Sequence, residues 1–438
     1  MDGNKAMVLP EGFRKLEPAR RRDLLHEILF GESAAKGTTH EDFLSTGRDE
    51  SLIELASLMV ESSIGYAPIP LGIAHGFLID GIHHEFPMAT EEPSVIAAAS
   101  YAARIIAKCG GFITSATDPV MVSQIFLEGV DEAGIAGIRE GAQRIRQEVQ
   151  PFLGSLPARG GGFREMSATR LPETGLVRVD LLVDVRDAMG ANILNSVAEG
   201  ICPLVESLSG GKRLMCILSN AATERRGRAG CVIPFDALER ISGSGFTGAE
   251  IARRISLATD LANEDPSRAV THNKGVMNGI SALALATFND CRSIEAAAHA
   301  WAARSGAYRS LSSWKVDGRT LVGELELPLS FGAVGGAAAF HPASRLALRM
   351  LGNPGAMELA RMAAALGLAQ NFAALLALVT GGIQRGHMRY HAPRIAYQAG
   401  ARGAEIESIA SAMTALRNFS HSEAEGLLAN LRAGLALE

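Results

Sequence analysis

Residues 176–219, LVRVDLLVDVRDAMGANILNSVAEGICPLVESLSGGKRLMCILS, decide the fold. Leu176–Val185 alternates as a strand does, Asn192–Ser209 has the apolar spacing of a helix, and Leu214–Ser219 is apolar enough for another strand. The glycine-containing turn at 187–192 joins the first strand to the helix. The stretch therefore predicts a compact unit that contains both helices and strands.

This unit extends towards the N-terminus as far as residue 119. A strand is expected near Met121–Val130 and a charged helix around Ile138–Val149, before a break at Arg159–Gly162. Outside the unit, Val95–Lys108 is an Ala-rich helix, and residues 220–378 alternate Ala-rich helices with short strands. More than one domain is therefore expected.

Length and composition agree with this. The chain has 438 residues, whereas a single core stops growing at about 250–300, so two or three domains are expected. A net charge of −5 argues against a general nucleic-acid-binding protein. The five cysteines lack zinc-site spacing and are odd in number, which favours a reducing cytoplasm.

The N-terminus lacks the apolar core of a signal peptide. The apolar stretch Met357–Thr380 contains Glu358 and Arg361, so a buried helix is expected there instead of a membrane span.

The acidic pair Glu91-Glu92 begins the motif EEPS, where Pro93 suits the first turn of the Ala-rich helix. Acidic side chains at a helix N-terminus commonly cap its N–H groups. The functional alternative is a carboxyl held beside another charge, from which it can donate a proton.

The turn DAMGAN (187–192) follows a strand and opens a helix. Backbone N–H groups in such a turn can approach a phosphate. The segment is not the GxGxxG of the ordinary dinucleotide fold. The alternative is a tight connection in which Asp187 or Asn192 caps a helix.

Lysine is rare in this chain, yet Lys274 lies in THNKGVMNG (271–279). We interpret this segment as a polar, Gly-flanked turn that leads into the apolar helix Ile280–Ala286. A charged lysine there can stabilise a developing oxyanion. The alternative is a lysine that extends to solvent at a helix start.

Asp290 precedes the expected helix Ser293–Arg304. Its position predicts an N-cap. The functional alternative is a buried carboxylate coupled to Lys274 or Glu92.

His387 and His391 in GHMRYH have the i, i+4 spacing of helical zinc ligands, but no third ligand lies nearby in the sequence and we expect no metal. A histidine there can instead protonate a leaving thiolate, and the neighbouring arginines suit phosphate groups. The alternative is a solvated polar segment.

In this order the motifs resemble those of class II 3-hydroxy-3-methylglutaryl-coenzyme A (HMG-CoA) reductases. The segments that carry the resemblance are ESSIG (61–65), EEPSVIAAAS (91–100), GGFITS (110–115), DVRDAMGAN (184–192), THNKGVMNGI (271–280), GGAAAFHP (335–342), GLAQNFAAL (367–375) and GGIQRGHMRYHA (381–392). They span roughly residues 60–405, which is most of the chain. One departure is that Pro393 places the flap arginine at Arg394, one position later than the family pattern.

The resemblance implies an α+β fold. A large, mostly helical domain carries an inserted ferredoxin-like domain that binds the dinucleotide, and a mobile flap ends the chain. By resemblance the large domain comprises residues 1–118 and 220–378, the small domain 119–219 and the flap 379–438. The active site is expected at a homodimer interface, and higher homo-oligomers occur in the family.

The resemblance also implies residue roles. Glu92 would protonate the reacting carbonyl oxygen, Lys274 would stabilise its negative charge, and Asp290 would tune this pair. His387 would protonate the departing coenzyme A thiolate. Reduction of a thioester to an alcohol takes two hydrides with expulsion of a thiol between them, which explains this set of groups. The implied HMG-binding residues are Ser94, Arg268 and Asn278, and the implied cofactor-binding residues are Asp187, Met189, Gly190, Ala191 and Asn192.

The function implied is an NAD(P)-dependent oxidoreductase of isoprenoid metabolism that interconverts HMG-CoA with mevalonate and coenzyme A. We expect NAD to be favoured, with NADP possible, and Glu148 is a candidate contact to the ribose. The protein is expected to be cytoplasmic, without a metal, a membrane or a nucleic acid as partner.

Two other functions compete with this one. An oxidoreductase for a different acyl-CoA or aldehyde would show changed contacts at Ser94, Arg268 or Asn278, yet all three match the motif. A non-catalytic oligomeric binding protein would lack one or more of the four catalytic residues, yet all four are present.

Overall fold

The structure is a computed structural model that describes residues 16–17, 20, 23–24, 50–242, 245–336, 341–381 and 383–435. The side chains of 50–53, 241–242 and 383–390 are outside this description. The chain separates into two compact units, Met1–Pro70 and Leu71–Glu438. Helix α3 (Glu50–Met59) belongs to the first unit, and every other helix and strand below belongs to the second.

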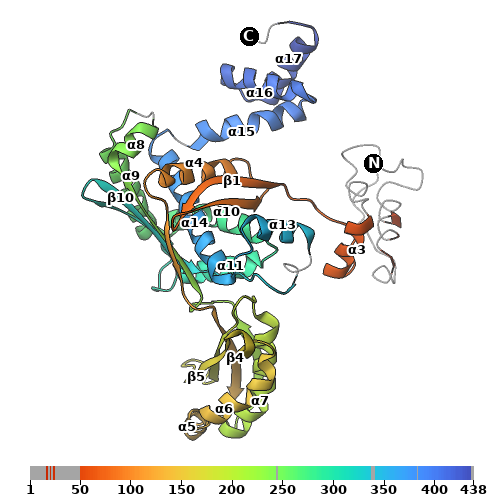
Figure 1. Ribbon diagram of the computed structural model, residues 1–438, viewed down its shortest axis with the longest axis vertical. Helices are drawn as coiled ribbons and strands as arrows, with labels where there is room; N and C mark the ends of the chain where they lie inside the picture. Colours follow the sequence, from red (N-terminus) through yellow and green to blue (C-terminus); the bar gives the residue numbers. More distant parts are fainter. Residues whose placement is uncertain are drawn as a thin grey trace. The chain divides into compact units, whose positions relative to one another are not determined.

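Residues 120–219 contain a four-stranded antiparallel sheet with the strand order β5-β6-β4-β7. The chain runs strand, helices, two strands, helix, strand, which is the ferredoxin-like βαββαβ topology. The elements, drawn in Figure 1, are β4 (Val120–Glu128), α5 (Glu132–Glu140), α6 (Ala142–Glu148), the 3-10 helices η2 (Gln150–Leu153) and η3 (Pro157–Arg159), β5 (Gly162–Arg170), β6 (Val177–Asp184), α7 (Ala191–Ser209) and β7 (Lys212–Ser219).

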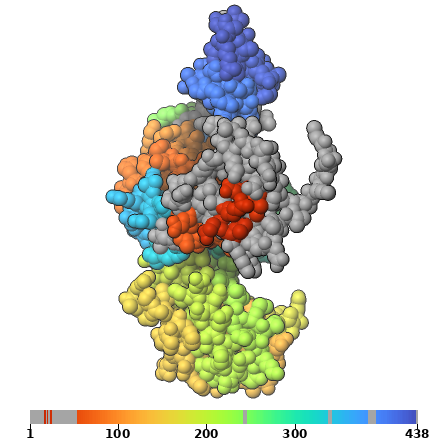
Figure 2. Space-filling view, turned by 90° about the vertical axis from the view of Figure 1, so that its right-hand side faces the viewer, coloured from red at the N-terminus to blue at the C-terminus, as the bar shows by residue number. Residues whose placement is uncertain are grey.

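The single charged helix expected at 138–149 is two short helices that meet at Gly141. A Cβ at this glycine would lie 2.5 Å from Leu208 Cδ1, so glycine at the break lets α7 approach closely. Helix α7 packs on the sheet because its apolar residues recur at helical spacing, and a separate core forms between them. The surface of this part is yellow and green in Figure 2.

The remaining strands form a second antiparallel sheet with the order β3-β8-β10-β9 and a hairpin of β1 and β2. The strands are β1 (Leu71–Ile79), β2 (Ile82–Ala89), β3 (Ile113–Ala116), β8 (Arg226–Pro234), β9 (Ser312–Asp317) and β10 (Thr320–Pro328). The helices are α4 (Val95–Ala107), α8 (Phe235–Ser242), α9 (Gly248–Glu264), α10 (Pro266–Ala286), α11 (Cys291–Ala302), α13 (Pro342–Met350) and α14 (Ala356–Val379).

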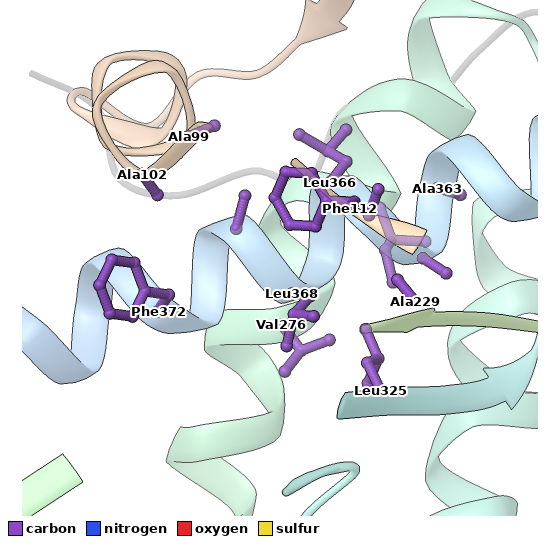
Figure 3. Packing of buried hydrophobic residues seen from close by; sticks show 14 of the residues in the cluster. Ala99, Ala102, Phe112, Ala229, Val276, Leu325, Ala363, Leu366, Leu368 and Phe372 are labelled. Carbon is purple, nitrogen blue, oxygen red and sulfur yellow. The ribbon is translucent and has the colours of Figure 1, made fainter. Parts of the chain in front are cut away.

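Helix α14 is the centre of the larger core. It is long and apolar enough to cross a membrane, but 78% of its most apolar window is buried inside the protein. Side chains of α4, α10, β8 and β10 surround it, as Figure 3 shows for Ala102, Val276, Ala229 and Leu325. The predicted buried helix is confirmed.

The small sheet is inserted between β3 and β8, which pair antiparallel with Ile113 opposite Gly230. Thr117 closes the junction, because its N–H donates to the Arg226 carbonyl at 3.0 Å and its Oγ1 accepts the Arg226 N–H at 2.8 Å. The outgoing and returning chains are therefore bonded to each other where they leave the larger core.

Three helices end the described chain: α15 (Ile383–Gln398), α16 (Ala404–Leu416) and α17 (His421–Arg432). They bury a small apolar cluster of their own around Met413 and Leu427. Pro393 lies inside α15. With this mixture of helices and antiparallel sheets, the predicted α+β fold class is confirmed.

Candidate active site

An ion pair joins two of the predicted catalytic residues. Lys274 Nζ lies 2.6 Å from Glu92 Oε2, although the residues are 182 positions apart in the chain. Glu92 comes from the loop before α4, and Lys274 comes from α10. The side chains are 37% and 58% exposed, so solvent or a ligand can reach both. A carbonyl oxygen placed here would meet an ammonium group and a carboxyl group together.

Glu92 does not cap α4, so the capping interpretation is wrong for this residue. The N-cap position belongs to Ser94, which has a left-handed φ of 72°. Pro93 therefore precedes the cap and is not in the first helical turn. A left-handed non-glycine residue is the kind of backbone strain that is found at functional sites.

Lys274 lies inside helix α10, so the predicted turn is also wrong. The helix begins earlier, at Pro266, because Asp265 Oδ1 accepts the Ser267 N–H at 2.9 Å as an N-cap. Gly279, which suggested a turn, is buried against α14, where a Cβ would lie 3.1 Å from Leu366. Packing therefore overrides the weak helix propensity of this segment.

A buried hydrogen-bond network holds α10 in place at His272, two residues before Lys274. His272 Nε2 lies 2.7 Å from Ser312 Oγ and 3.1 Å from Asn371 Nδ2. Asn371 Oδ1 accepts from Ser312 Oγ at 2.9 Å and from Trp314 Nε1 at 2.7 Å. All four side chains are buried. The network joins α10, β9 and α14, and among the described residues His272 Nδ1 has no hydrogen-bond partner.

Burial keeps His272 neutral. Loss of solvation, helped by the nearby charge of Arg268, lowers the pKa of His272 to about 4. Sequence reasoning missed this network, because its members come from distant segments. The available signal was Asn371, a polar residue in a predominantly apolar helix.

Asn273 adds a second anchor. Its Nδ2 donates to the Arg309 carbonyl at 2.8 Å, and its Oδ1 accepts the Leu311 N–H at 2.9 Å. Two successive inward-facing residues therefore fix the rotation of α10. The next residue, Lys274, consequently faces outward.

Two of the predicted HMG-binding residues lie on the same helix, Asn278 about 40° and Arg268 about 120° from Lys274 around its axis. Arg268 and Asn278 are partly buried, and with Lys274 they fall within an arc of about 120° when each residue turns the helix by about 100°. Ser94 stands two positions after Glu92. The fold therefore brings the predicted substrate residues to the elements that carry the ion pair.

Asp290 is the N-cap of α11, which confirms the capping interpretation of its position in the sequence. Its Oδ1 accepts the N–H groups of Arg292 and Ser293, both at 3.1 Å, and lies 3.1 Å from Arg292 Nη2. The side chain is partly exposed. Its coupling to Lys274 or Glu92 stays a prediction.

The turn 187–192 joins β6 to α7, as predicted. Gly190 is the N-cap of α7 with a φ of 97°, and among the described residues no side chain caps the N–H groups of this helix. Asp187 instead caps α14, since its Oδ1 accepts the Ala356 N–H at 2.8 Å. Asp187 and Asn192 are exposed, whereas Met189 and Ala191 are partly buried. The N-terminus of α7 can therefore receive an anion.

A buried arginine that the sequence did not reveal contacts this turn. Arg225 Nη1 donates to the carbonyls of Ala188 and Met189, at 3.1 and 3.4 Å, and Nη2 donates to the carbonyl of Phe331. Burial lowers the pKa of Arg225 to about 10, still a cation at neutral pH. No local pattern around residue 225 distinguishes it from its arginine neighbours.

His387 belongs to α15, but its side chain lies outside the described residues. Its role as an acid stays a prediction.

Comparison with known proteins identifies the family. The family model for hydroxymethylglutaryl-coenzyme A reductase matches residues 17–392. A 3-hydroxy-3-methylglutaryl-coenzyme A reductase from Archaeoglobus fulgidus is 44% identical over 390 residues, which cover 87% of this chain and 86% of that protein. A probable reductase of the same name from Borreliella burgdorferi is 36% identical over 389 residues, covering 89% and 87%.

The fold gives the same answer. A solved class II HMG-CoA reductase from Streptococcus pneumoniae, bound to NADPH, aligns with a TM-score of 0.73 and 40% identity, over 86% of this chain and 92% of that one. Another structure of the pneumococcal enzyme covers 97% of this chain at 37% identity, again with a TM-score of 0.73. The resemblance carried by the EEPS, DAMGAN and THNKG motifs is confirmed, and the chain belongs to the HMG-CoA reductase family.

Proposed function

We propose that this protein is an HMG-CoA reductase that interconverts HMG-CoA with mevalonate and coenzyme A. The observation that carries the proposal is the 2.6 Å contact between Glu92 and Lys274, which unites the EEPS and THNKG motifs. In the reductive direction, one HMG-CoA, two reduced nicotinamides and two protons give mevalonate, coenzyme A and two oxidised nicotinamides.

Lys274 stabilises the negative charge that develops on the carbonyl oxygen each time hydride reaches the carbon, and Glu92 supplies a proton to that oxygen. Between the two hydride transfers the carbon–sulfur bond breaks, and His387 protonates the coenzyme A sulfur. Asp290 tunes the Glu92–Lys274 pair in this proposal.

The HMG moiety carries a free carboxylate, which a guanidinium recognises through paired N–H groups. Arg268 is suited to this role, because it is partly buried on α10, the helix that carries Lys274. Asn278 and Ser94 contribute further polar contacts to the same moiety.

The turn 187–192 fits a nicotinamide dinucleotide, which supplies or accepts hydride when bound. The uncapped N-terminus of α7 offers its N–H groups to the pyrophosphate. Gly190 keeps the turn tight, since a Cβ there would lie 2.7 Å from Val185 Cγ1. We assign the contacts to Asp187, Met189, Gly190, Ala191 and Asn192.

NAD is the proposed preference. Glu148, exposed at the end of α6, is the acidic candidate for the ribose 2′-hydroxyl. The NADPH bound to the pneumococcal relative makes NADP the competing choice.

The same proposal assigns HMG-CoA to residues 1–118 and 220–378, the dinucleotide to 119–219, and a closing flap to 379–438. It also includes a cytoplasmic homodimer or higher homo-oligomer. Oxyanion stabilisation is strongest where water is excluded, yet the side chains of Glu92 and Lys274 are exposed in the single chain. A second chain or the flap would therefore have to cover them during the reaction.

The test is the absorbance of the reduced nicotinamide in a solution of purified protein, mevalonate, coenzyme A and either NAD or NADP. A rise with one cofactor supports the reaction and identifies the preferred dinucleotide. No rise with either, together with no fall when HMG-CoA and a reduced cofactor are supplied, would contradict the proposal and favour another acyl-CoA.

A further inference from the structure

A short segment after β10 contacts both the cofactor turn and the loop that holds Asp290. The N–H groups of Ala333 and Val334 both donate to the Asp187 carbonyl, at 2.8 and 3.2 Å. Between them and β10, the N–H of Gly332 donates to Asn289 Oδ1 at 2.7 Å. The backbone of residues 331–334, called the strip below, is therefore hydrogen-bonded to the turn 187–192 on one side and to Asn289, the neighbour of Asp290, on the other.

The side chain of Arg225 makes a second connection between this strip and the turn 187–192. Its guanidinium bonds to Ala188 and Met189 through one nitrogen and to Phe331 through the other. The planar guanidinium fixes the separation of these carbonyls, because its donors have a rigid geometry. The Arg225 carbonyl also accepts the Leu329 N–H at 2.9 Å.

Gly332 allows the strip and the turn to touch. A Cβ at this position would lie 2.7 Å from the Met189 nitrogen and 3.2 Å from its Cα. These are backbone atoms, so no side-chain rotation can relieve the contact. The segment can therefore take only glycine here without displacing the turn.

Asn289 connects the strip to the helix that carries Lys274. Its N–H donates to the Ala284 carbonyl at 2.8 Å, and its Nδ2 donates to Thr287 Oγ1 at 2.9 Å, both at the end of α10. In α11, Ser293 Oγ donates to Asn220 Oδ1 at 3.0 Å, immediately after β7. The residues on either side of Asp290 are thus hydrogen-bonded to two other parts of the fold: Asn289 to the end of α10, and Ser293 to the residue that follows β7.

We propose that Arg225, Gly332 and Asn289 are positioning residues that hold the dinucleotide turn at a fixed separation from Asp290 and α10. The inference rests on the proposed function, because it takes 187–192 as the dinucleotide site. Two hydride transfers require a fresh dinucleotide for the second, so the turn must present the cofactor in the same place twice. A misplacement of about 1 Å can cost about 100-fold in rate.

The first test substitutes Gly332→Ala in the full-length protein. We expect the Kd of the reduced dinucleotide, measured by its fluorescence during titration, to rise about tenfold, which is about 1.4 kcal/mol. The kcat should fall about tenfold or more, while the KM for HMG-CoA stays within about twofold. Gly230→Ala is the matched control, since its Cβ would meet only the Gly323 carbonyl at an ordinary 3.6 Å.

The second test substitutes Asn289→Ala, which removes the acceptor of the Gly332 N–H. The same increase in dinucleotide Kd is expected. Asn289→Asp keeps an oxygen at this position and should recover most of the affinity. Asn263→Ala is the control, because Asn263 is also partly buried and accepts a backbone N–H, that of Ser310 at 3.3 Å.

The outcomes separate positioning from a loss of folded protein. A variant that is merely destabilised has fewer active molecules, so its kcat falls while the dinucleotide Kd and both KM values stay unchanged. If Asn289→Ala lowered kcat but bound the reduced dinucleotide with the Kd of the wild type, the inference would be overturned. This holds even if Gly332→Ala failed to fold. Failure of the proposed function differs, because wild-type protein would then not turn over HMG-CoA at all.

Discussion

The loops that precede α4 and α11 both contain acidic residues near a helix start, but they place them differently. Asp290 stands directly before α11 and accepts two N–H groups of its first turn. Glu92 stands two positions before Ser94, the N-cap of α4, and its carboxylate pairs with Lys274 of α10. The comparison teaches that an acidic residue near a helix start becomes available for chemistry when another residue holds the cap position and a cation lies within reach.

The largest effect should come from the ion pair. Lys274→Ala removes the group that stabilises the oxyanion and should lower kcat with HMG-CoA by about 100- to 1000-fold. Glu92→Gln should lower it by about 100- to 10,000-fold through loss of the acid. Reduced-nicotinamide absorbance measures both. Turnover within about threefold of wild type in either variant would remove the pair from the mechanism and erase the contrast between the two loops.

The next effect concerns the helix that brings Lys274 to Glu92. Burial lowers the pKa of His272 from 6.5 to about 4. Between pH 6.5 and about pH 4, His272 is therefore protonated in the unfolded chain but neutral in the folded chain. The unfolding free energy should therefore fall by about 3 kcal/mol as the pH drops from 6.5 to about 4. Urea denaturation at a series of pH values measures this.

A matched pair of variants isolates His272. His272→Gln removes the titrating group and should flatten this part of the pH profile, although its baseline stability will be lower. His421→Gln is the surface control, because His421 is exposed on α17 and, among the described residues, pairs only with the exposed Glu425 at 3.4 Å; it should change the profile much less than His272→Gln does. An unchanged acid dependence in His272→Gln would assign the loss of stability to other groups.

Local patterns predicted much of the fold. The strand–turn–helix at 176–209 was predicted because alternation, a Gly-containing turn and helical spacing all occur within a few residues of one another. The buried character of α14 followed from an apolar run that contains a few charges. The prediction for THNKG was wrong because Asn and Gly suggest a turn locally, whereas Gly279 permits close packing against Leu366.

The parts of the site that sequence reasoning missed depend on distant partners. His272, Ser312 and Asn371 come from three elements, and only the fold shows that they bond to one another. Arg225 looks like its neighbours until its guanidinium is placed among backbone carbonyls. The motifs predicted that Glu92 and Lys274 act together, but the distance between them follows only from the folded structure.

A smaller effect distinguishes the two functions of Asp290. Asp290→Ala should lower the unfolding free energy by about 1 kcal/mol, whereas Asp290→Asn, which retains a good cap, should stay within a few tenths. If the charge also tunes Lys274, both variants should lose at least about tenfold in kcat. Full turnover in Asp290→Asn would make Asp290 a cap alone, and the contrast with Glu92 would become sharper.

The smallest expected effect is the contribution of the ion pair to stability. Because Glu92 and Lys274 are 37% and 58% exposed, water screens their attraction, and such pairs contribute about 0–1 kcal/mol. A double-mutant cycle of Glu92→Gln and Lys274→Ala in urea should give a coupling in this range that weakens with added salt. A coupling of several kcal/mol that persists in high salt would mean that the pair holds α4 against α10. Glu92 would then serve the fold as Asp290 does, by a different contact, and its exposure would no longer argue for chemistry.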